Sequence, residues 1–282
     1  MKIITKTNEL KQDLKKLSIK SIGFVPTMGY LHEGHLSLIK ESKRENDITV
    51  VSIFINPTQF SPNEDFTKYP RDITRDENLL KKSEVDYLFY PSINEIYNKY
   101  HHTYIIVEDL NNKLCGKSRP THFKGVTTIV LKLFNIVKPQ RAYFGRKDAQ
   151  QAIIIKRMIK DLNLDIQLKT MPIVRDVNGL ALSSRNVYLT PEERISATKL
   201  NLSLSKAKSM IENNKILNAE IIKNSIKEVL ENDKNIKTDY IEIVDLINLN
   251  PLETIKLNNT LVAIAAWVGN TRLIDNFVLG EI

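Results

Sequence analysis

The chain has very little cysteine, because Cys115 is the only one in 282 residues. A single thiol cannot form an internal disulfide or a cysteine-rich metal site. It suits a reducing compartment. We expect Cys115 to pack as a small apolar side chain. No uninterrupted apolar run approaches the ~20 residues that a membrane span requires, and the start, "MKIITKTNELKQDLKKL", is too polar for a signal peptide. We therefore expect a cytoplasmic protein with no membrane partner.

Basic residues are in excess but are not clustered. Lys and Arg number 41 against 33 Asp and Glu, which gives a formal net charge of +8. A nucleic-acid-binding module would concentrate Lys and Arg on one face and interleave them with aromatic side chains, whereas segments such as "KSIKEVLENDKNIK" mix lysines with acidic and apolar residues. The charge is compatible with anionic small substrates and predicts no nucleic-acid partner.

Apolar runs alternate with helical patterns from the N-terminus to about residue 175. Candidate strands cover 22–25, 48–55, 85–90, 141–145 and 168–174, and candidate helices cover 35–46, 73–84, 127–138 and 150–162. These strands are mostly apolar along their length rather than alternating, as expected for a parallel sheet covered on both faces. The sequence therefore predicts an α/β fold with a Rossmann-like, doubly wound domain at residues 1–175.

The pattern changes after this point. Thr190 has the position of a helix N-cap, Pro191 that of the first helical residue, and two glutamates follow in the first turn. A second helical pattern covers 218–233, and the runs 239–245, 260–268 and 271–279 look like antiparallel strands. We therefore expect a smaller α+β C-terminal domain at residues 176–282.

The stretch "PTMGYLHEGHLSLI", residues 26–39, forms a polar turn between a strand and a helix. If His35 opens the helix, His32 and His35 face the same volume above the carboxyl end of the strand, where open α/β sheets bind ligands. Gly29 and Gly34 allow close approach to the backbone, and the free N–H groups at the helix start favour a phosphate. Two structural histidines are the alternative, whereas a zinc pair lacks a third nearby ligand and a GxGxxG dinucleotide loop needs different spacing.

Two further loops offer polar side chains where predicted strands end. "FINPTQF" contains the amides of Asn56 and Gln59, which suit a hydroxyl or carboxylate, although an Asn-Pro turn is an alternative explanation. "YFGRKDAQQ" offers Lys147 for a phosphate and Asp148 for a ribose or a metal, with Gln151 about one helical turn later. The alternative for this second loop is a solvated connection.

Two more loops complete the set. "LALSSRN" places Arg185 after two serines, where a forked guanidinium can hold a polyphosphate or the loop can serve as a plain polar connection. "SRPTHFKGV" combines Arg119 and His122 before an apolar helix, with capping, an interface or catalysis as alternatives. Because all these loops converge on one edge of the sheet, the sequence predicts a site for a nucleotide and a small molecule.

Six of these segments, in this order, closely resemble the signatures of the pantoate–β-alanine ligase family. They are "PTMGYLHEGHLSLI", "SIFINPTQFSPNEDFTKYPR", "RPTHFKGV", "YFGRKDAQQ", "GLALSSRNVYL" and "TRLIDN". The resemblance covers essentially the whole chain. The His-x-Gly-His pair alone indicates only the wider nucleotidyltransferase superfamily, and a member that transfers AMP to a phosphate acceptor would need more arginine than the paired glutamines provide.

The resemblance implies a two-step ligation. (R)-Pantoate attacks the α-phosphorus of ATP and releases pyrophosphate, and β-alanine then displaces AMP from pantoyl adenylate to give pantothenate. Pantoate is expected at Gln59 and Gln151, and β-alanine also at Gln59. ATP is expected along Met28, Gly29, Tyr30, Leu31, His32, Glu33, Gly34, His35, Gly145, Arg146, Lys147, Asp148, Val174, Leu182, Ser183, Ser184 and Arg185. The expected catalytic residues are His35, His32, Lys147 and Arg185, which suit charge that develops on phosphate oxygens.

The resemblance also bears on the metal and on assembly. Magnesium is expected to be carried mainly by ATP, because no dense carboxylate cluster is evident, with Asp76 as an auxiliary contact. A homodimer formed through the larger domain is expected. Two positions depart from the family pattern: Arg146 stands where an acidic residue is usual, and Ala149 where an aromatic one is common. These changes affect a ribose contact or a salt bridge near the nucleotide but leave Lys147 and Asp148 in place.

Overall fold

The computed structural model describes residues 1–17, 19–62 and 64–282. A parallel sheet has the order β1-β4-β3-β2-β5-β6. Its strands are β1 (Lys2–Ile4), β2 (Ile22–Thr27), β3 (Ile48–Ile53), β4 (Tyr87–Phe89), β5 (Arg141–Gly145) and β6 (Gln167–Met171). The chain runs from β2 to one edge and returns to β5 on the other side of β2, so the order reverses beside β2, where such sheets bind ligands.

The pairing of β2 with its two neighbours is unequal. β2 pairs with β3 along all six of its residues, but the ladder with β5 joins only Gly23 to Arg141 and Phe24 to Ala142. The carboxyl half of β2 is therefore free of ladder contacts with β5. This opens a crevice at the edge of the sheet where the predicted polar loops lie.

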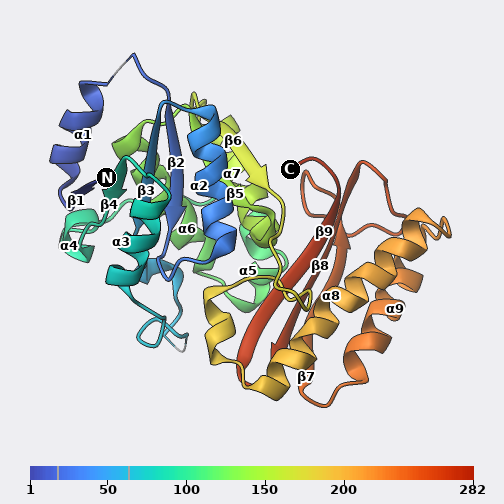
Figure 1. Ribbon diagram of the computed structural model, residues 1–282. Coiled ribbons are helices and arrows are strands. Elements are labelled where there is room, and N and C mark those ends of the chain that lie inside the picture. Colours follow the sequence, from blue (N-terminus) through green and yellow to red (C-terminus); the bar gives the residue numbers. More distant parts are fainter. Residues whose placement is uncertain (18, 63) are drawn as a thin grey trace.

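Helices cover both faces of this sheet (Figure 1). Alternate strand residues face opposite ways, so Phe24 and Val50 join the apolar cluster on one face and Val25 and Val51 join the cluster on the other. The first face packs against α1 (Thr7–Lys15), α6 (His122–Val137) and α7 (Ala149–Asp161), and the second against α2 (Glu33–Glu45) and α3 (Ile73–Lys82). The predicted doubly wound α/β architecture is confirmed.

The C-terminal part is a three-stranded antiparallel sheet of β7 (Ile236–Val244), β8 (Asn259–Val268) and β9 (Thr271–Gly280) with α8 (Pro191–Glu212) and α9 (Ala219–Glu231). Val262 and Ile264 of β8 pack with the α8 and α9 side, whereas Leu261 and Ala263 join a cluster that includes α7. The small sheet therefore lies between its own helices and the larger part, as Figure 1 shows. The smaller α+β unit is confirmed, and the boundary at residue 176 stays a prediction.

Several element bounds differ from those predicted. β1 was not predicted, because three residues at a sheet edge carry too little periodicity to be recognised. β6 ends at Met171 because Pro172 cannot donate to the ladder. α6 begins at His122 rather than at residue 127, and Gly125 inside it is explained by packing, since a Cβ there would collide with the carbonyl group of Thr58.

Short elements connect these layers. They are α4 (Ile93–Ile96), α5 (Cys115–Ser118) and the 3-10 turns η1 (Pro57–Gln59), η2 (Leu110–Asn112), η3 (Arg146–Asp148) and η4 (Ser184–Tyr188). Within the parts of the chain that the structure describes, we find no helix both long enough and apolar enough to cross a bilayer.

Candidate active site

One open cavity lies at the crevice beside β2. It has a volume of about 1400 Å³ including its mouth, enough for a nucleotide and a second small molecule by comparison with ordinary ligand pockets. Its lining includes these predicted site residues: Met28, His32, Gly34, His35, Gln59, Gly145, Lys147, Asp148, Gln151, Val174, Leu182, Ser183, Ser184 and Arg185. The structure thus brings most of the predicted residues together, and which ligand each one contacts stays a prediction.

The histidine turn, residues 28–35, begins α2 in a different way from that predicted. The helix starts at Glu33, so His32 is its N-cap and His35 is the third helical residue, whereas the sequence placed the start at His35. His32 Nδ1 accepts from Gly34 N at 3.2 Å, and His35 Nδ1 accepts from His32 N at 3.3 Å. The ring centroids are 4.1 Å apart. Both imidazoles therefore lie together at the positive end of a helix.

These hydrogen bonds determine where each neutral ring carries its proton. Because Nδ1 accepts in both rings, the proton of the neutral form lies on Nε2. Burial, with Lys147 nearby, lowers the pKa of His32 to about 4. Burial also lowers the pKa of His35 well below its usual value, with His32 and Lys147 contributing. At neutral pH the turn therefore offers two uncharged N–H donors.

Buried histidines make the stability depend on pH in a defined direction. The folded-state pKa values of His32 and His122 are lowered from 6.5 to about 4, so the unfolded chain binds more protons between these values. We expect the free energy of unfolding to decrease as the pH falls from 6.5 to 4. Urea unfolding of wild type and His122→Gln at several pH values would measure this, and the variant should show a shallower slope.

The exposed His102 provides a matched control for this experiment. Protonation of paired carboxylates in acid also lowers the free energy of unfolding. The test therefore compares the slope of this free energy against pH between variants, rather than using the wild-type slope alone. His102→Gln should reproduce the wild-type profile. Equal slopes for wild type and His122→Gln would contradict the assignment.

Glycine and aspartate shape the histidine turn. Gly29 has φ +84°, a conformation that glycine adopts without strain. Asp76, only 1% exposed, accepts from Tyr30 N at 2.6 Å and Leu31 N at 2.8 Å. At Gly34 a Cβ would lie 2.9 Å from the His32 ring. The buried carboxylate of Asp76 thus holds the backbone that precedes α2. The His32 ring packs against Gly34, which has no side chain.

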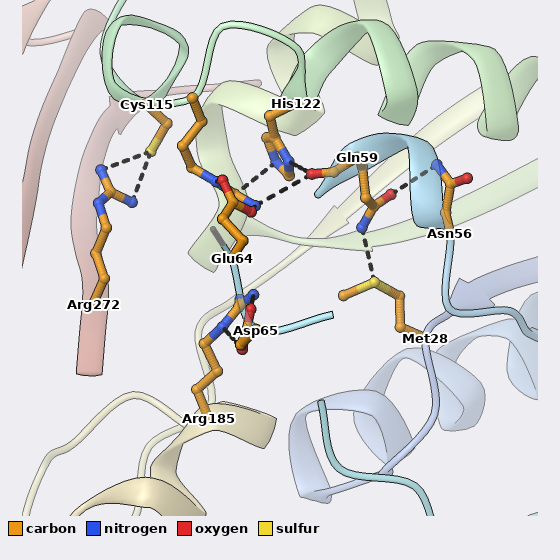
Figure 2. A network of polar contacts seen from close by, with 10 residues as sticks. Met28, Asn56, Gln59, Glu64, Asp65, Cys115, His122, Arg185 and Arg272 are labelled. Atoms are coloured by element: carbon orange, nitrogen blue, oxygen red, sulfur yellow. Dashed lines mark hydrogen bonds and ion pairs between the residues drawn. The ribbon is translucent and has the colours of Figure 1, made fainter. Parts of the chain in front are cut away.

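Asn56 and Gln59 form a buried amide pair on η1 (Figure 2). Asn56 Nδ2 donates to Gln59 Oε1 at 3.2 Å and to the Gly125 carbonyl at 3.0 Å, and Gln59 Nε2 donates to the Met28 sulfur at 2.8 Å. A sulfur acceptor is weak, so Gln59 can exchange it for a better partner. The amide pair is therefore held in place by α6 while retaining capacity to bind a polar ligand.

Arg119 and His122 lie beside this amide pair. His122 Nδ1 donates to the Gln59 carbonyl at 2.9 Å, and its Nε2 accepts from Arg119 at 3.2 Å. Arg119 also forms an ion pair with Glu64, with Nε 2.8 Å from Oε1. Burial and Arg119 lower the pKa of His122 to about 4, so this ring is neutral. The sequence left capping, an interface role or catalysis open for Arg119 and His122. The structure places both residues at the site, where they fix the backbone of Gln59.

Lys147 lies on η3 and lines the same cavity as the two turn histidines. Its side chain is 20% exposed and its Nζ is 3.7 Å from Asp148 Oδ1. It is the cation that contributes to the lowered pKa of both turn histidines. Lys147 is thus placed to act together with the two neutral donors on one anion.

Arg146, the departure from the family pattern, points elsewhere. Its Nε donates to Thr170 Oγ1 on β6 at 3.3 Å. We expect Arg146→Glu, which restores the usual acidic residue, to change kcat/KM by less than tenfold, or about 1.4 kcal/mol. Steady-state kinetics checks this, with Lys147→Met in the same turn as the comparison. A loss as large as that of Lys147→Met would show that Arg146 takes part in the reaction.

Arg185 is already paired, as Figure 2 shows. Its Nε and Nη2 each lie 2.8 Å from an oxygen of Asp65, and its guanidinium lies over the Tyr69 ring at 5.6 Å. Burial opposes ionisation of Asp65, but Arg185 outweighs it and lowers the pKa of the carboxyl. These two contacts leave the N–H groups of Arg185 Nη1 unused, so the predicted contact with a polyphosphate can form while the pair with Asp65 stays intact.

Some predicted residues lie away from the cavity. Gly29, Tyr30 and Asp76 border a neighbouring hollow. Leu31 is fully buried and its backbone N–H and carbonyl bind Asp76 and Arg75, while Glu33 is exposed. These residues and Arg146 are not among the described residues that line the cavity, and their contacts with ATP stay predictions. Asp76 binds the backbone of the turn, and its contact with an ion also stays a prediction.

The described residues, 1–17, 19–62 and 64–282, contain no group of three or more His, Cys, Asp and Glu side chains arranged to hold a metal ion. Both oxygens of Asp76 bind backbone N–H groups. A magnesium ion here must therefore take most of its ligands from phosphate and water. The donor set fits magnesium bound through ATP rather than a resident metal.

The sequence analysis did not identify the residues that hold the predicted site residues in place. Glu64 and Asp65 pair with the two site arginines, and Asn276 contacts the turn that carries Lys147. The acidic pair is visible in "SPNEDF", but its partners are 55 and 120 residues away. Only the motif "TRLIDN" signalled Asn276, and it gave no role.

With this geometry established, the chain can be compared with known proteins. A family model described as pantoate-beta-alanine ligase matches residues 2–278. The chain belongs to the pantoate–β-alanine ligase family. It is 55% identical to pantothenate synthetase of Pseudothermotoga lettingae, with 100% of each chain covered. It is 56% identical to that of Thermosipho africanus, over 99% of this chain and 100% of the relative.

Solved structures of the pantoate–β-alanine ligase family share the fold. Pantothenate synthetase from Thermus thermophilus superposes with a TM-score of 0.94 at 40% identity, and 100% of each chain is covered. The enzyme from Francisella tularensis, solved as a complex with β-γ ATP and β-alanine, gives a TM-score of 0.79 at 38% identity over 99% of this chain and 97% of that one. The predicted family and fold are therefore confirmed.

Proposed function

We propose that the chain catalyses ATP-dependent condensation of (R)-pantoate with β-alanine to pantothenate, releasing AMP and pyrophosphate. One observation carries the proposal: two neutral histidine donors and Lys147 share a cavity with the buried amides of Asn56 and Gln59. The first group suits a polyphosphate and the second a small polar acid. Membership of the pantoate–β-alanine ligase family supports the same reaction.

In the first step a carboxylate oxygen of pantoate bonds to the α-phosphorus of ATP, and the bond to the bridging oxygen breaks with release of magnesium pyrophosphate. Negative charge grows on the phosphate oxygens, and donors held in place before the reaction stabilise it most. The Nε2–H groups of His32 and His35 supply neutral donors, and Lys147 supplies a positive charge. Neutral rings suit this role because they donate without adding charge beside Lys147.

Pantoate carries two hydroxyls and a carboxylate around a carbon with two methyl groups. Gln59 and Gln151 suit the polar groups, and the apolar wall formed by Val126, Ile129 and Val130 of α6 suits the methyl groups. A site built from buried amides rejects an analogue that leaves them unpaired. In the second step the neutral amine of β-alanine attacks the acyl carbon beside Gln59, loses a proton and displaces AMP.

The proposal also covers the metal ion, the domains, the oligomeric state and the cellular location. Magnesium enters on ATP. The division into domains 1–175 and 176–282 places the histidine turn in the larger domain and Arg185 in the smaller one, so both contribute to the cavity. We also infer a homodimer, on the family resemblance, and a cytoplasmic location, supported by the lone Cys115.

Isotope exchange tests the proposed function. With ATP, magnesium and pantoate but no β-alanine, the protein should exchange labelled pyrophosphate into ATP, because adenylation precedes the need for the amine. Omission of pantoate should stop the exchange. Gln59→Ala and Gln151→Ala should raise the KM for pantoate far more than that for ATP. Exchange that requires β-alanine, or that proceeds equally with unrelated carboxylic acids, would refute the proposal.

A further inference from the structure

The motif "TRLIDN", residues 271–276, opens β9 and has no part in the chemistry described so far. Its last two residues, Asp275 and Asn276, are 3% and 4% exposed. Both line a cavity that adjoins the main one and shares Lys147 and Arg185 with it. Polar side chains this deeply buried need partners. The side-chain partner of Asp275 and both partners of Asn276 Nδ2 lie in the larger part of the molecule, whereas Asn276 Oδ1 has no partner among the described residues.

Asn276 binds the turn that carries Lys147. Its Nδ2 donates to the Arg146 carbonyl at 3.0 Å and to the Lys147 carbonyl at 2.8 Å. These two carbonyls belong to η3, a turn of three residues. One side-chain amide thus fixes two successive peptide groups of the turn from a strand about 130 residues away in sequence.

Asp275 makes a second connection. Its carboxylate accepts from Arg175 at 2.6 and 2.9 Å and from the backbone N–H of Asn276 at 2.8 Å. Arg175 directly follows Val174, which lines the main cavity together with Lys147 of η3. The middle of β9 therefore contacts two segments that line the cavities, and the hydrogen bond from Asn276 N to Asp275 links the two residues.

Apart from Asn276, the described residues restrain the η3 turn through Arg146, whose Nε donates to Thr170 Oγ1 at 3.3 Å. Gly145 precedes it, and a Cβ at that position would meet nothing within 4 Å, so this side of the turn is open. Lys147 itself contacts Asp148 at 3.7 Å, a weak interaction for a partly exposed pair. The carbonyl contacts with Asn276 are therefore a main restraint on the direction in which Lys147 leaves the backbone.

We propose that Asn276 is a positioning residue for adenylation, which holds η3 so that Lys147 faces the polyphosphate. The proposal rests on the proposed function, because it assigns Lys147 to the reaction. Asn276 contributes through its N–H donors, and the isosteric Asn276→Asp removes them and places a carboxylate against two carbonyl oxygens. Displacement of a catalytic group by about 1 Å can cost about 100-fold in rate. Asn276→Asp should therefore lower kcat for pyrophosphate exchange by about 10- to 100-fold while the KM for pantoate stays unchanged.

A double-mutant cycle gives the decisive measurement. Exchange rates are compared for wild type, Asn276→Asp, Lys147→Met and the double variant, and Asn276→Ala is measured in both backgrounds in case the aspartate variant does not fold. If Asn276 acts through Lys147, replacing Asn276 should have little further effect once Lys147 is methionine. Asn235→Asp is the matched control. Asn235 is an asparagine of the smaller part whose side chain also donates a hydrogen bond, but to Ser196 in the same part, at 3.1 Å. It should keep wild-type kcat.

Each outcome decides the proposal. A purely structural role would lower the rate by the same factor in both backgrounds and would overturn it, as would an Asn276 variant with wild-type kcat. Full activity of Lys147→Met would also overturn it, since Asn276 would then have no catalytic group to position. Absence of pantoate-dependent exchange in wild type would refute the proposed function instead, so the two failures are distinguishable.

Discussion

Replacement of His35 by alanine should slow formation of the acyl adenylate by about 10² to 10³-fold, because one preorganised donor to a developing oxyanion contributes that much. The ring is half-buried, neutral and near Lys147, so its Nε2–H is stronger toward a phosphate oxygen than it would be in water. Single-turnover chemical quench with radiolabelled ATP measures the step directly. His32→Ala should be comparably severe, since the two rings lie together.

The fold should survive this replacement. His35 also accepts the N–H of His32, and loss of a helix cap costs about 1 kcal/mol against a total stability of about 5–15 kcal/mol. His102→Ala, at an exposed histidine, is the control and should react at the wild-type rate. Unchanged adenylate formation in both His32 and His35 variants would show that neither ring contacts the phosphates.

Gly34→Ala should separate stability from activity. Gly34 lies inside the first turn of α2, where alanine is favoured over glycine by about 1 kcal/mol. Its Cβ, however, would lie 2.9 Å from Cε1 and Nδ1 of His32 and must displace that ring. Displacing the ring also loses the N-cap of α2, which costs about 1 kcal/mol and offsets the gain, so we expect a melting temperature close to that of wild type. We expect kcat to be lower by about 100-fold.

Differential scanning calorimetry and exchange kinetics on the same preparation test both halves of this expectation. Lys40→Ala, at an exposed position of the same helix, serves as the control and should change neither quantity. If Gly34→Ala reacts at the wild-type rate, the ring of His32 can move without penalty, and its position is not what makes the turn effective.

The fold was predictable where local patterns were strong. The apolar runs of β2, β3 and β5, and the Thr190–Pro191 signal at the start of α8, correspond to observed elements. β1 was missed because Lys2–Ile4 is held by pairing with β4, a long-range contact with no local signature. The start of α2 was misplaced for a different, local reason: it depends on His32 acting as an N-cap, a role that sequence rules assign to Ser, Thr, Asp and Asn.

The site was predictable as a set of loops but not as a set of contacts. Strand ends placed His32, Gln59 and Lys147 at one edge of the sheet without any structure. The partner of Arg185 was not predictable, because Asp65 is 120 residues away and an arginine in a polar loop suits a phosphate equally well. The contacts of Asp76 with the histidine turn were not predictable either, since nothing local distinguishes a carboxylate that holds a backbone turn from one that binds a metal.

The close packing of α6 on η1 limits how the substrate range of this enzyme can be altered. A Cβ at Gly125 would collide with the backbone of Thr58 and Gln59, and the Gly125 carbonyl binds Asn56. This contact between α6 and η1 therefore restrains the position of the amide pair. Engineering toward acids with bulkier or smaller carbon skeletons should accordingly vary Val126, Ile129 and Val130 and leave the amides alone. A library confined to those wall positions should retain activity in far more of its members than one that includes Gly125.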